Sequence, residues 1–362
     1  MVPEGWKKAR FSEVATIANG QVDPRIEPYS EMLHIGPENV SAHTGQVTGC
    51  KTGKELGLIS GKYEFDEEAI VYSKIRPSLN KVCRPRSKGL CSAVMYPIWP
   101  TSEVSADYLY QYMLSEHFCR AAVAMSMRTG MPKINRSDLN SIRVLYPPLS
   151  EQKRISQVLS AWDEAITTTE RLIEVSQQQK NALMQQLLTG KRRLPGFESE
   201  WRAVPIGSLF RKVSRPVAWD DNFLYPLISV RRRSGGVFLR ESLYGREIKT
   251  KNLSMIKSGD FLISKMQVVH GALSKVASDY DGCYVSGSYV ILRPKDDACV
   301  SVDFFDWLSR TDKIYNMTYL CSYGVHIEKM TFNIDLFLKE EVCIPVDVEE
   351  QNAIAKVLSH AD

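Results

Sequence analysis

The sequence is short of the features that mark secreted, membrane-spanning and zinc-binding proteins. Its eight cysteines form no Cys-X-X-Cys pair, and its six histidines are scattered without the spacing of a zinc site. No apolar run approaches the roughly 20 residues of a membrane-spanning helix, and the N-terminus has no apolar targeting stretch. We therefore expect a cytoplasmic protein with reduced thiols and no membrane association.

Motifs for methyl transfer and nucleotide binding are incomplete. Residues 146–149, YPPL, resemble the Asn/Asp-Pro-Pro-aromatic motif of amino-methyltransferases but lack the leading amide or acid, and no glycine-rich S-adenosylmethionine loop precedes them. Residues 57–62, GLISGK, are one residue short of a P-loop, and Tyr63 replaces the Ser or Thr that would bind magnesium. Neither stretch predicts a cofactor site.

A nuclease site is only weakly indicated. Glu247-Ile248-Lys249 matches half of a nuclease Glu-X-Lys pair, for which Asp220 or Asp221 would supply the second carboxylate. Such a tripeptide is common by chance. We therefore expect no catalytic residue, no metal site and no cofactor in this chain.

The charge of the chain is informative in its distribution rather than its total. The 362 residues suggest two domains or three, with an ordinary 44% of apolar and 24% of charged residues and a net charge of +4. Residues 73–92 contain six lysines and arginines and no acid, and Arg231-Arg232-Arg233 forms a second basic run. Such local clusters suit a phosphate backbone, although a solvated surface is the alternative.

The strongest signal is an internal repeat, in which residues 1–163 and 196–362 carry the same motifs in the same order. The offset between the copies drifts by a few residues, as loop insertions between fixed elements would produce. The matching pairs are Trp6 with Trp201, 69–75 with 260–266, Gly130 with Gly324, and 151–160 with 350–359.

Each copy consists of a body of roughly 150 residues followed by a helix. The bodies contain short apolar runs typical of strands, at 69–75, 141–146, 284–292 and 341–344, separated by Gly, Pro, Asn and Asp. Residues 108–127 and 304–317 have helical patterns. We therefore expect an α+β fold in each body.

The helix between the bodies is predicted from its boundaries and its apolar spacing. Pro147-Pro148 stops the preceding strand, Ser150 is a suitable N-cap, and Gly190 is a suitable residue to follow the last turn. About 40 residues give a rod roughly 60 Å long. Apolar residues at alternating spacings of four and three predict that this helix forms a coiled coil. The alternative is that the helix packs on one of the bodies. The apolar seam comprises Ile155, Leu159, Trp162, Ile166, Ile173, Leu183 and Leu187.

These motifs resemble one known family, the specificity subunits of type I restriction-modification enzymes. Residues 147–155, PPLSEQKRI, are similar to the start of that family's central conserved helix, and residues 180–190, KNALMQQLLTG, to its end. Residues 193–201 are similar to the segment that leads into the second recognition domain. The helix motifs are specific, whereas the bodies between them are not.

The resemblance implies a fold and a function. Two target-recognition domains, joined by helices that pair antiparallel as a spacer, would each bind one half of a split, asymmetric site in double-stranded DNA. The helices would dock methyltransferase subunits that use S-adenosylmethionine, and motor-nuclease subunits that use ATP and magnesium would join them. The alternatives are a non-catalytic DNA-binding adaptor of another defence system and an uncharacterised nuclease.

The expected domains are 1–149 (first recognition domain), 150–190 (spacer helix), 191–345 (second recognition domain) and 346–362 (start of a second conserved helix). Only about 13 residues follow Glu350, so we expect the second helix to be shortened. The uncovered seam would then favour self-association through residues 150–190, or dependence on a partner subunit.

The residues expected at DNA lie in segments that correspond between the two copies. They follow the strands that end at Ser73 and Ser264, follow the glycines Gly130 and Gly324, or form the arginine run. The set comprises Lys74, Arg76, Asn80, Lys81, Arg84, Lys133, Asn135, Arg136, Arg231, Arg232, Arg233, Lys265, Gln267, His270, Lys275, His326 and Lys329.

Overall fold

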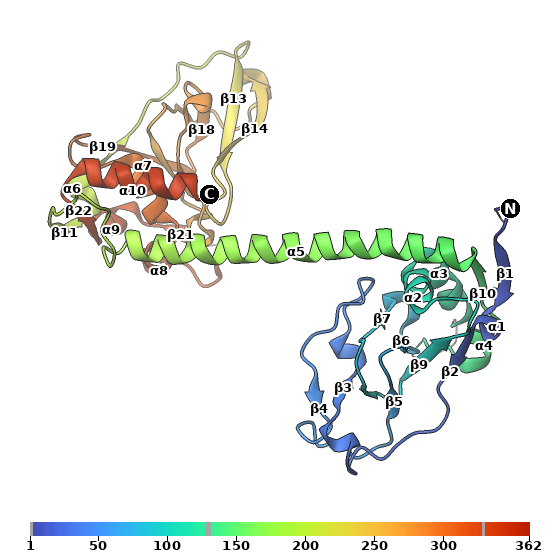
Figure 1. The fold of residues 1–362 in the computed structure, drawn as a ribbon. Helices are drawn as coiled ribbons and strands as arrows, with labels where there is room; N and C mark the ends of the chain where they lie inside the picture. The colour runs from blue at the N-terminus through green and yellow to red at the C-terminus, as the bar shows by residue number, and fades with distance from the viewer. Residues whose placement is uncertain (1–2, 127–131, 328–329) are drawn as a thin grey trace. The chain divides into compact units, whose positions relative to one another are not determined.

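The structure is a computed structural model that describes residues 3–126, 132–327 and 330–362. It divides into two compact units, Met1–Glu170 (unit 1) and Arg171–Asp362 (unit 2). The helix α5 (Leu149–Leu187) continues from the first unit into the second (Figure 1). The expected α+β fold, with two sheet-rich bodies linked by a long helix, is confirmed. The four-part division of the chain stays a prediction.

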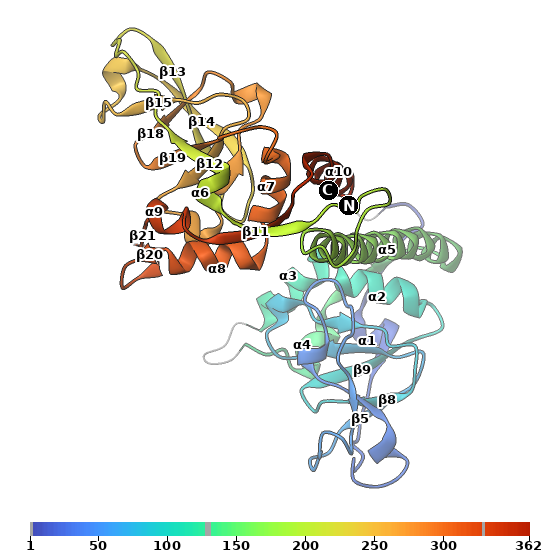
Figure 2. The ribbon, with the colours of Figure 1, turned by 90° about the vertical axis from the view of Figure 1, so that its left-hand side faces the viewer.

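The described residues of unit 1 form one two-stranded and two four-stranded sheets. Its helices are short, and in Figure 2 α2 and α3 lie between α5 and the strand β9. The sheets are β1 (Lys7–Arg10) with β10 (Arg143–Tyr146); β2 (Ala15–Ile17), β9 (Met95–Pro100), β6 (Ile70–Ser73) and β7 (Val82–Cys83); and β4 (Lys51–Thr52), β3 (Leu33–Ile35), β8 (Gly89–Cys91) and β5 (Tyr63–Phe65). The helices are α1 (Phe11–Val14), α2 (Ala106–Leu114), α3 (Glu116–Met125) and α4 (Arg136–Ser141).

Unit 2 repeats these sheets in the same strand order. Its sheets are β11 (Trp201–Pro205) with β22 (Glu341–Pro345); β12 (Phe210–Val213), β19 (Tyr289–Pro294), β16 (Phe261–Ser264) and β17 (Leu273–Lys275); and β14 (Val237–Tyr244), β13 (Leu224–Val230), β18 (Tyr284–Ser286) and β15 (Leu253–Met255). A further pair joins β20 (Ser322–Tyr323) to β21 (Thr331–Phe332). The helices are α6 (Ile206–Leu209), α7 (Val302–Ser309), α8 (Asp312–Leu320), α9 (Ile334–Phe337) and α10 (Val348–His360).

The central strands β6 and β16 are apolar except for the serine that ends each of them, because both of their faces are covered. In β6, Ile70 and Tyr72 belong to the core cluster beneath the helices, whereas Val71 belongs to the cluster shared with the other four-stranded sheet. In β16, Phe261 and Leu262 divide between two clusters in the same way. Alternate side chains of a strand point to opposite faces, so a strand between two layers needs apolar residues at every position.

The two long helices expected within the bodies are each broken into two. Ser115 has an extended backbone and its hydroxyl accepts from the N–H of Phe118, so it separates α2 from α3 as the N-cap of α3. Thr311, also extended, separates α7 from α8. The apolar periodicity continues across both breaks, which is why the sequence suggested single helices. Met127, the expected end of the first, lies outside the described residues.

The helix α5 packs on the bodies only at its ends. Ile155 packs on the core of unit 1, and Leu187 is fully buried in that of unit 2. Every residue from 161 to 179 is exposed. Gly190 has the left-handed backbone (φ 69°) expected after the last turn, and a Cβ there would lie 3.1 Å from the ring of Trp201.

Within unit 2, α10 runs antiparallel to the C-terminal part of α5 and the segment that follows it. Glu350, near the start of α10, pairs with Arg193 at 2.6 Å, and Asp362, beyond its end, pairs with Lys180. Ile354 and Leu358 share a core cluster with Leu187. This direction agrees with the predicted antiparallel pairing of the conserved helices.

One buried glutamine in each unit, Gln152 on α5 and Gln351 on α10, ties the helix to its body. The amide of Gln152 accepts from Ser105 N at 2.8 Å and donates to the carbonyls of Glu103 and Pro147. Gln351 accepts from Ser301 N at 2.8 Å and donates to Pro345 O in the same way. The repeat seen in the sequence therefore extends to individual hydrogen bonds.

All eight cysteines are free thiols. Within the described part of the chain, no helix combines the length and the apolar character needed to cross a bilayer.

Candidate nucleic-acid interface

In unit 1, two segments expected at DNA lie side by side. Arg76 N donates to Pro132 O at 2.8 Å, and Ile134 N donates to Lys74 O at 2.9 Å. Ile75 and Lys133 form an antiparallel bridge between these contacts. The segment that follows β6 is therefore joined to the segment that leads into α4, although they are far apart in the sequence.

This junction gathers positive charge around Tyr96. The Lys74 ammonium lies 5.1 Å from the centre of the Tyr96 ring, and the Arg136 guanidinium lies 5.3 Å from it. Burial lowers the pKa of Lys74, and the nearby charges of Lys133 and Arg136 lower it further. Because like charges repel one another here, a bound anion would relieve the repulsion.

Two further basic residues lie beside this junction. Arg76 is exposed, and Lys81 donates from its ammonium to Pro37 O. Both line a cavity of 360 Å³ together with Ser73 and Ile75. The loop after β6 therefore presents Arg76 and Lys81 on the same concave surface.

Three other members of the expected set have structural contacts. Asn80 is fully buried, and its amide donates to Met113 O and Leu114 O at 3.1 and 3.0 Å. Arg84 is held by Asp107 and Glu68. Asn135 accepts from Asp138 N at 2.8 Å as the N-cap of α4. These side chains hold the loops in place.

In unit 2, the arginine run lies against the loop that follows β16. Arg233 N donates to His270 O at 2.7 Å, and Ser234 N donates to Gly271 O at 2.9 Å. Arg233 and Ser234 both have left-handed backbones, so the chain turns sharply here. The Arg231 guanidinium lies 4.5 Å from the centre of the Phe238 ring.

Lys265 connects this loop to two others. Its ammonium donates to Gly287 O at 2.8 Å, and its backbone carbonyl accepts from Phe332 N at 3.1 Å. Gln267 precedes the short 3₁₀ helix Val268–His270, and its side chain makes no capping hydrogen bond. His326 is exposed in the loop after β20.

Lys275 does not lie with the residues of the loop that follows β16. It lies opposite Phe261, at the other end of β16 from Ser264, and pairs with Asp303. Arg232 and His270 have contacts of their own. Lys329 lies outside the described residues.

One basic surface was not predicted. Arg215 and Arg293 both pair with the fully buried Asp260, Arg215 through two hydrogen bonds of 2.7 and 3.1 Å. With Arg211, Lys212 and Lys257, they line a depression of 500 Å³. Arg211, Lys212 and Arg215 are close in sequence, but Lys257 and Arg293 join them only through the fold.

The weak nuclease motif is not assembled into a site. The Glu247 carboxylate accepts from Tyr244 N, and Asp221 accepts from Lys251 and from the Trp219 indole. Among the described residues, no group of three or more His, Cys, Asp or Glu side chains has the arrangement needed to hold a metal ion.

Comparison with known proteins identifies the N-terminal half. Residues 3–177 match the family model described as the type I restriction modification DNA specificity domain. The chain is 36% identical over 202 residues to the EcoDI specificity subunit of Escherichia coli, which covers 56% of this chain and 44% of that protein. It is 33% identical over 195 residues to the MjaVIII specificity subunit of Methanocaldococcus jannaschii, covering 52% and 43%.

Solved structures share the fold along the chain. The type I restriction-modification S subunit from M. genitalium matches with a TM-score of 0.61 and 15% identity, over 99% of this chain and 89% of that one. A chain from a structure describing complex assembly and conformational transition of a type I system matches with a TM-score of 0.54 and 18% identity, over 99% and 90%.

The duplicated scaffold, the connecting helix and the paired basic loops define a two-headed α+β protein. Residues 3–177 carry the type I restriction modification DNA specificity domain, and the relatives that match this chain are type I specificity subunits. It spans less than half the length of the two curated relatives named above.

Proposed function

We propose that this chain is the non-catalytic subunit that determines which DNA sequence a type I restriction-modification enzyme recognises. Unit 1 and unit 2 each bind one half of a bipartite, asymmetric site in double-stranded DNA. The observation that carries the proposal is the duplicated scaffold, which in each unit brings basic segments distant in sequence to one place. Two different heads on one scaffold suit two different half-sites.

The DNA contacts divide into two kinds. Lysines and arginines bind phosphates and set the position of the duplex, whereas side chains that reach base edges select the sequence. Asn80, Arg84 and Asn135 act indirectly, because Asn80 is buried and the side chains of Arg84 and Asn135 make contacts within unit 1. The residues retained for contact are Lys74, Arg76, Lys81, Lys133, Arg136, Arg231, Arg232, Arg233, Lys265, Gln267, His270 and His326.

The helices are the docking elements in this proposal. Adenine-methyltransferase subunits, which bind S-adenosylmethionine, dock on α5 and α10, and motor-nuclease subunits that use ATP and magnesium join them. Support comes from the exposed middle of α5, where Leu159, Trp162, Ile166 and Ile173 keep between 40% and 67% of their surface. In the absence of those subunits, we propose that this apolar face pairs with the same face of a second copy.

A domain exchange tests the two-headed proposal. Residues 1–149 are replaced by the equivalent body of another family member, and the exchanged chain is assembled with its methyltransferase subunits. The sites that become methylated are then sequenced. We expect one half-site to change and the other to stay the same, whereas a change in both half-sites would contradict separate recognition.

The competing functions have tests of their own. Incubation of the isolated chain with labelled S-adenosylmethionine and duplex DNA should transfer no label, and incubation with DNA and divalent metal should produce no cleavage. Cleavage would favour the nuclease alternative. Neighbouring genes for methyltransferase and motor subunits distinguish this function from that of an adaptor in another defence system.

A further inference from the structure

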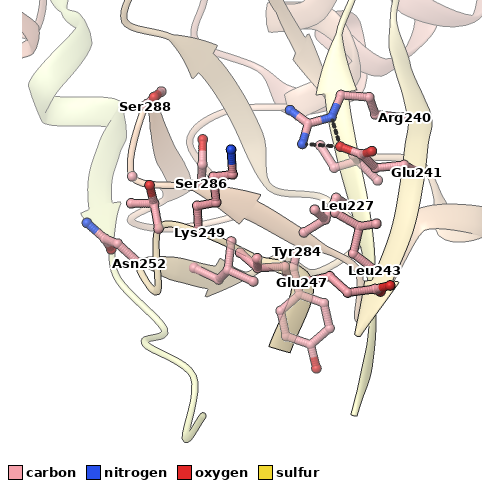
Figure 3. A pocket seen from close by; sticks show the side chains of 15 residues that line it. Leu227, Arg240, Glu241, Leu243, Glu247, Lys249, Asn252, Tyr284, Ser286 and Ser288 are labelled. Atoms are coloured by element: carbon pink, nitrogen blue, oxygen red, sulfur yellow. Dashed lines mark hydrogen bonds and ion pairs between the residues drawn. The ribbon is translucent and has the colours of Figure 1, made fainter. Parts of the chain in front are cut away.

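Unit 2 contains a cavity of 640 Å³ beside the hairpin of β13 and β14 (Figure 3). Its lining combines the apolar Leu227, Leu243 and Tyr284 with polar side chains that include Lys249 and Asn252. A concave surface of this size with a few converging polar groups is the usual form of a ligand site.

Four polar side chains of the lining are without a partner in the described part of the protein. Among the described residues, the Lys249 ammonium, the Asn252 amide and the hydroxyls of Ser286 and Ser288 make no hydrogen bond or ion pair, and all four residues line the cavity (Figure 3). Together these groups supply donors and acceptors for something that enters the cavity.

A β-bulge brings Arg240 to the same cavity. Leu227 pairs with Glu241 and Ile228 pairs with Leu239, so Arg240 is the extra residue on β14. Bulges redirect side chains and are common beside functional sites. The Arg240 Nε donates to Glu241 Oε1 at 2.8 Å, which places a donor group and an acceptor group next to each other on the rim (Figure 3).

The cavity adjoins the interface described above. Gly287 and Ser288, on its lining, accept from the ammonium and the backbone N–H of Lys265 at 2.8 and 2.9 Å. The strand β13, which supplies Leu227 and Ile228, runs directly into Arg231.

The two units share one strand order, but the length of this hairpin differs between them. In unit 1, the corresponding strands β3 and β4 pair only at Leu33 and His34. In unit 2, β13 pairs with β14 along its whole length, from Leu224 to Val230. An element that differs between two otherwise repeated heads is suited to distinguish their half-sites.

We propose that the hairpin of β13 and β14 beside this cavity enters the major groove of the half-site bound by unit 2, and that Arg240, Glu241, Lys249 and Asn252, on the lining of the cavity, determine which bases are accepted there. Arginine and lysine donate to guanine O6 and N7, glutamate accepts from cytosine N4, and asparagine pairs with adenine N6 and N7. This inference rests on the proposed function, because it names residues that select sequence within it.

The test is a selection from duplexes of randomised sequence, using the full chain assembled with its methyltransferase subunits and the variants Lys249→Ala and Asn252→Ala in the same assembly. Both side chains are exposed and without protein partners, so neither variant should unfold unit 2. We expect each to reduce discrimination roughly tenfold at one or two positions of one half-site, which corresponds to about 1.4 kcal/mol. The other half-site should be unchanged.

Lys251→Ala is the matched control. Lys251 is two residues from Lys249, but it pairs with Asp221 and lies over the Trp219 ring, outside the cavity. The Lys251→Ala variant should select the same DNA sequences as the unchanged chain. If Lys249→Ala and Asn252→Ala select the same sequences as the unchanged chain, this inference is overturned and the proposed function stands. If the unchanged chain selects no sequence, both are overturned.

Discussion

Trp201 donates its indole N–H to the Glu350 carboxylate at 3.4 Å, and Trp6 makes the same contact with Glu151 at 3.3 Å in the other copy. The surroundings of the two carboxylates differ. Glu350 is fully buried and also accepts from Arg193 and Ser199, whereas Glu151 is exposed. Equivalent contacts in the two units therefore differ in their contribution to stability.

We expect Glu350→Gln to destabilise unit 2 by about 2–3 kcal/mol. The change removes the charge that pairs with Arg193, whose side chain is 31% exposed, so water offsets part of the cost of breaking a buried pair. The control Glu151→Gln should cost less than about 0.5 kcal/mol, because exposed contacts contribute little. Hydrogen exchange resolved by peptide would report each unit separately. Equal losses for both variants would contradict this difference.

The thiols should react in an order set by burial. Cys299 and Cys343 are exposed, whereas Cys83 and Cys91 are buried. Burial raises the pKa of Cys83 to about 12 and also raises the pKa of Cys91. A thiol-specific reagent at pH 8 should therefore label Cys299 and Cys343 in the folded chain, and Cys83 and Cys91 only after unfolding. Mass spectrometry of labelled peptides gives the order, and early labelling of Cys83 would contradict it.

The same shift has a consequence for stability at high pH. The pKa of Cys83 in the folded state lies above the ordinary value of 9.0, so the neutral thiol is favoured by folding. Its contribution to stability is complete below pH 9 and is lost as the pH rises towards 12. Cys83→Ala should weaken this part of the alkaline unfolding, as followed by circular dichroism. An alkaline transition unchanged by the substitution would contradict the contribution.

The sequence revealed the repeat and the long helix because both rest on regular spacing. The expected helix 150–190 is α5, Leu149–Leu187, and the expected left-handed Gly190 is present. The breaks at Ser115 and Thr311 could not be predicted, because one extended residue leaves the apolar periodicity intact.

The sequence alone also does not predict which polar side chains are buried, or which residues from different strands meet. Asn80 lies in a basic segment yet is interior, because its amide satisfies two carbonyls at the end of α2. Arg215, Asp260 and Arg293 meet only through sheet pairing. The placement of Arg240 depends on a bulge in strand register, which the residue types alone do not indicate.

Replacing Arg76 and Lys133 tests the basic junction of unit 1. Both are exposed on segments that lie side by side. If each contacts one phosphate, each Ala variant should weaken DNA binding at all sequences and reduce the slope of log K against log salt by about 1. Binding is measured by fluorescence anisotropy across a salt series.

Arg120→Ala is the control for this measurement, because Arg120 is exposed but pairs with Glu116 on α3. Its salt slope should equal that of the unchanged chain. If Arg76→Ala and Lys133→Ala also have the salt slope of the unchanged chain, these two residues do not contact the DNA.

The final prediction concerns the exposed face of α5. Trp162 and Ile166 keep 67% and 53% of their surface, and Ile173 keeps 65%. Burying one such side chain stabilises an interface by about 1.5–3 kcal/mol, so the isolated chain should self-associate at tens of micromolar. Trp162→Glu with Ile166→Glu should abolish the dimer while both heads stay folded. Thr167→Glu with Thr168→Glu adds the same charge about 100° or more around the helix from Trp162 and Ile166 and should leave the dimer intact. Light scattering measures the association, and circular dichroism checks that the variants stay folded. A monomeric unchanged chain would contradict the dimer. A dimer that survives Trp162→Glu with Ile166→Glu would place the contact elsewhere.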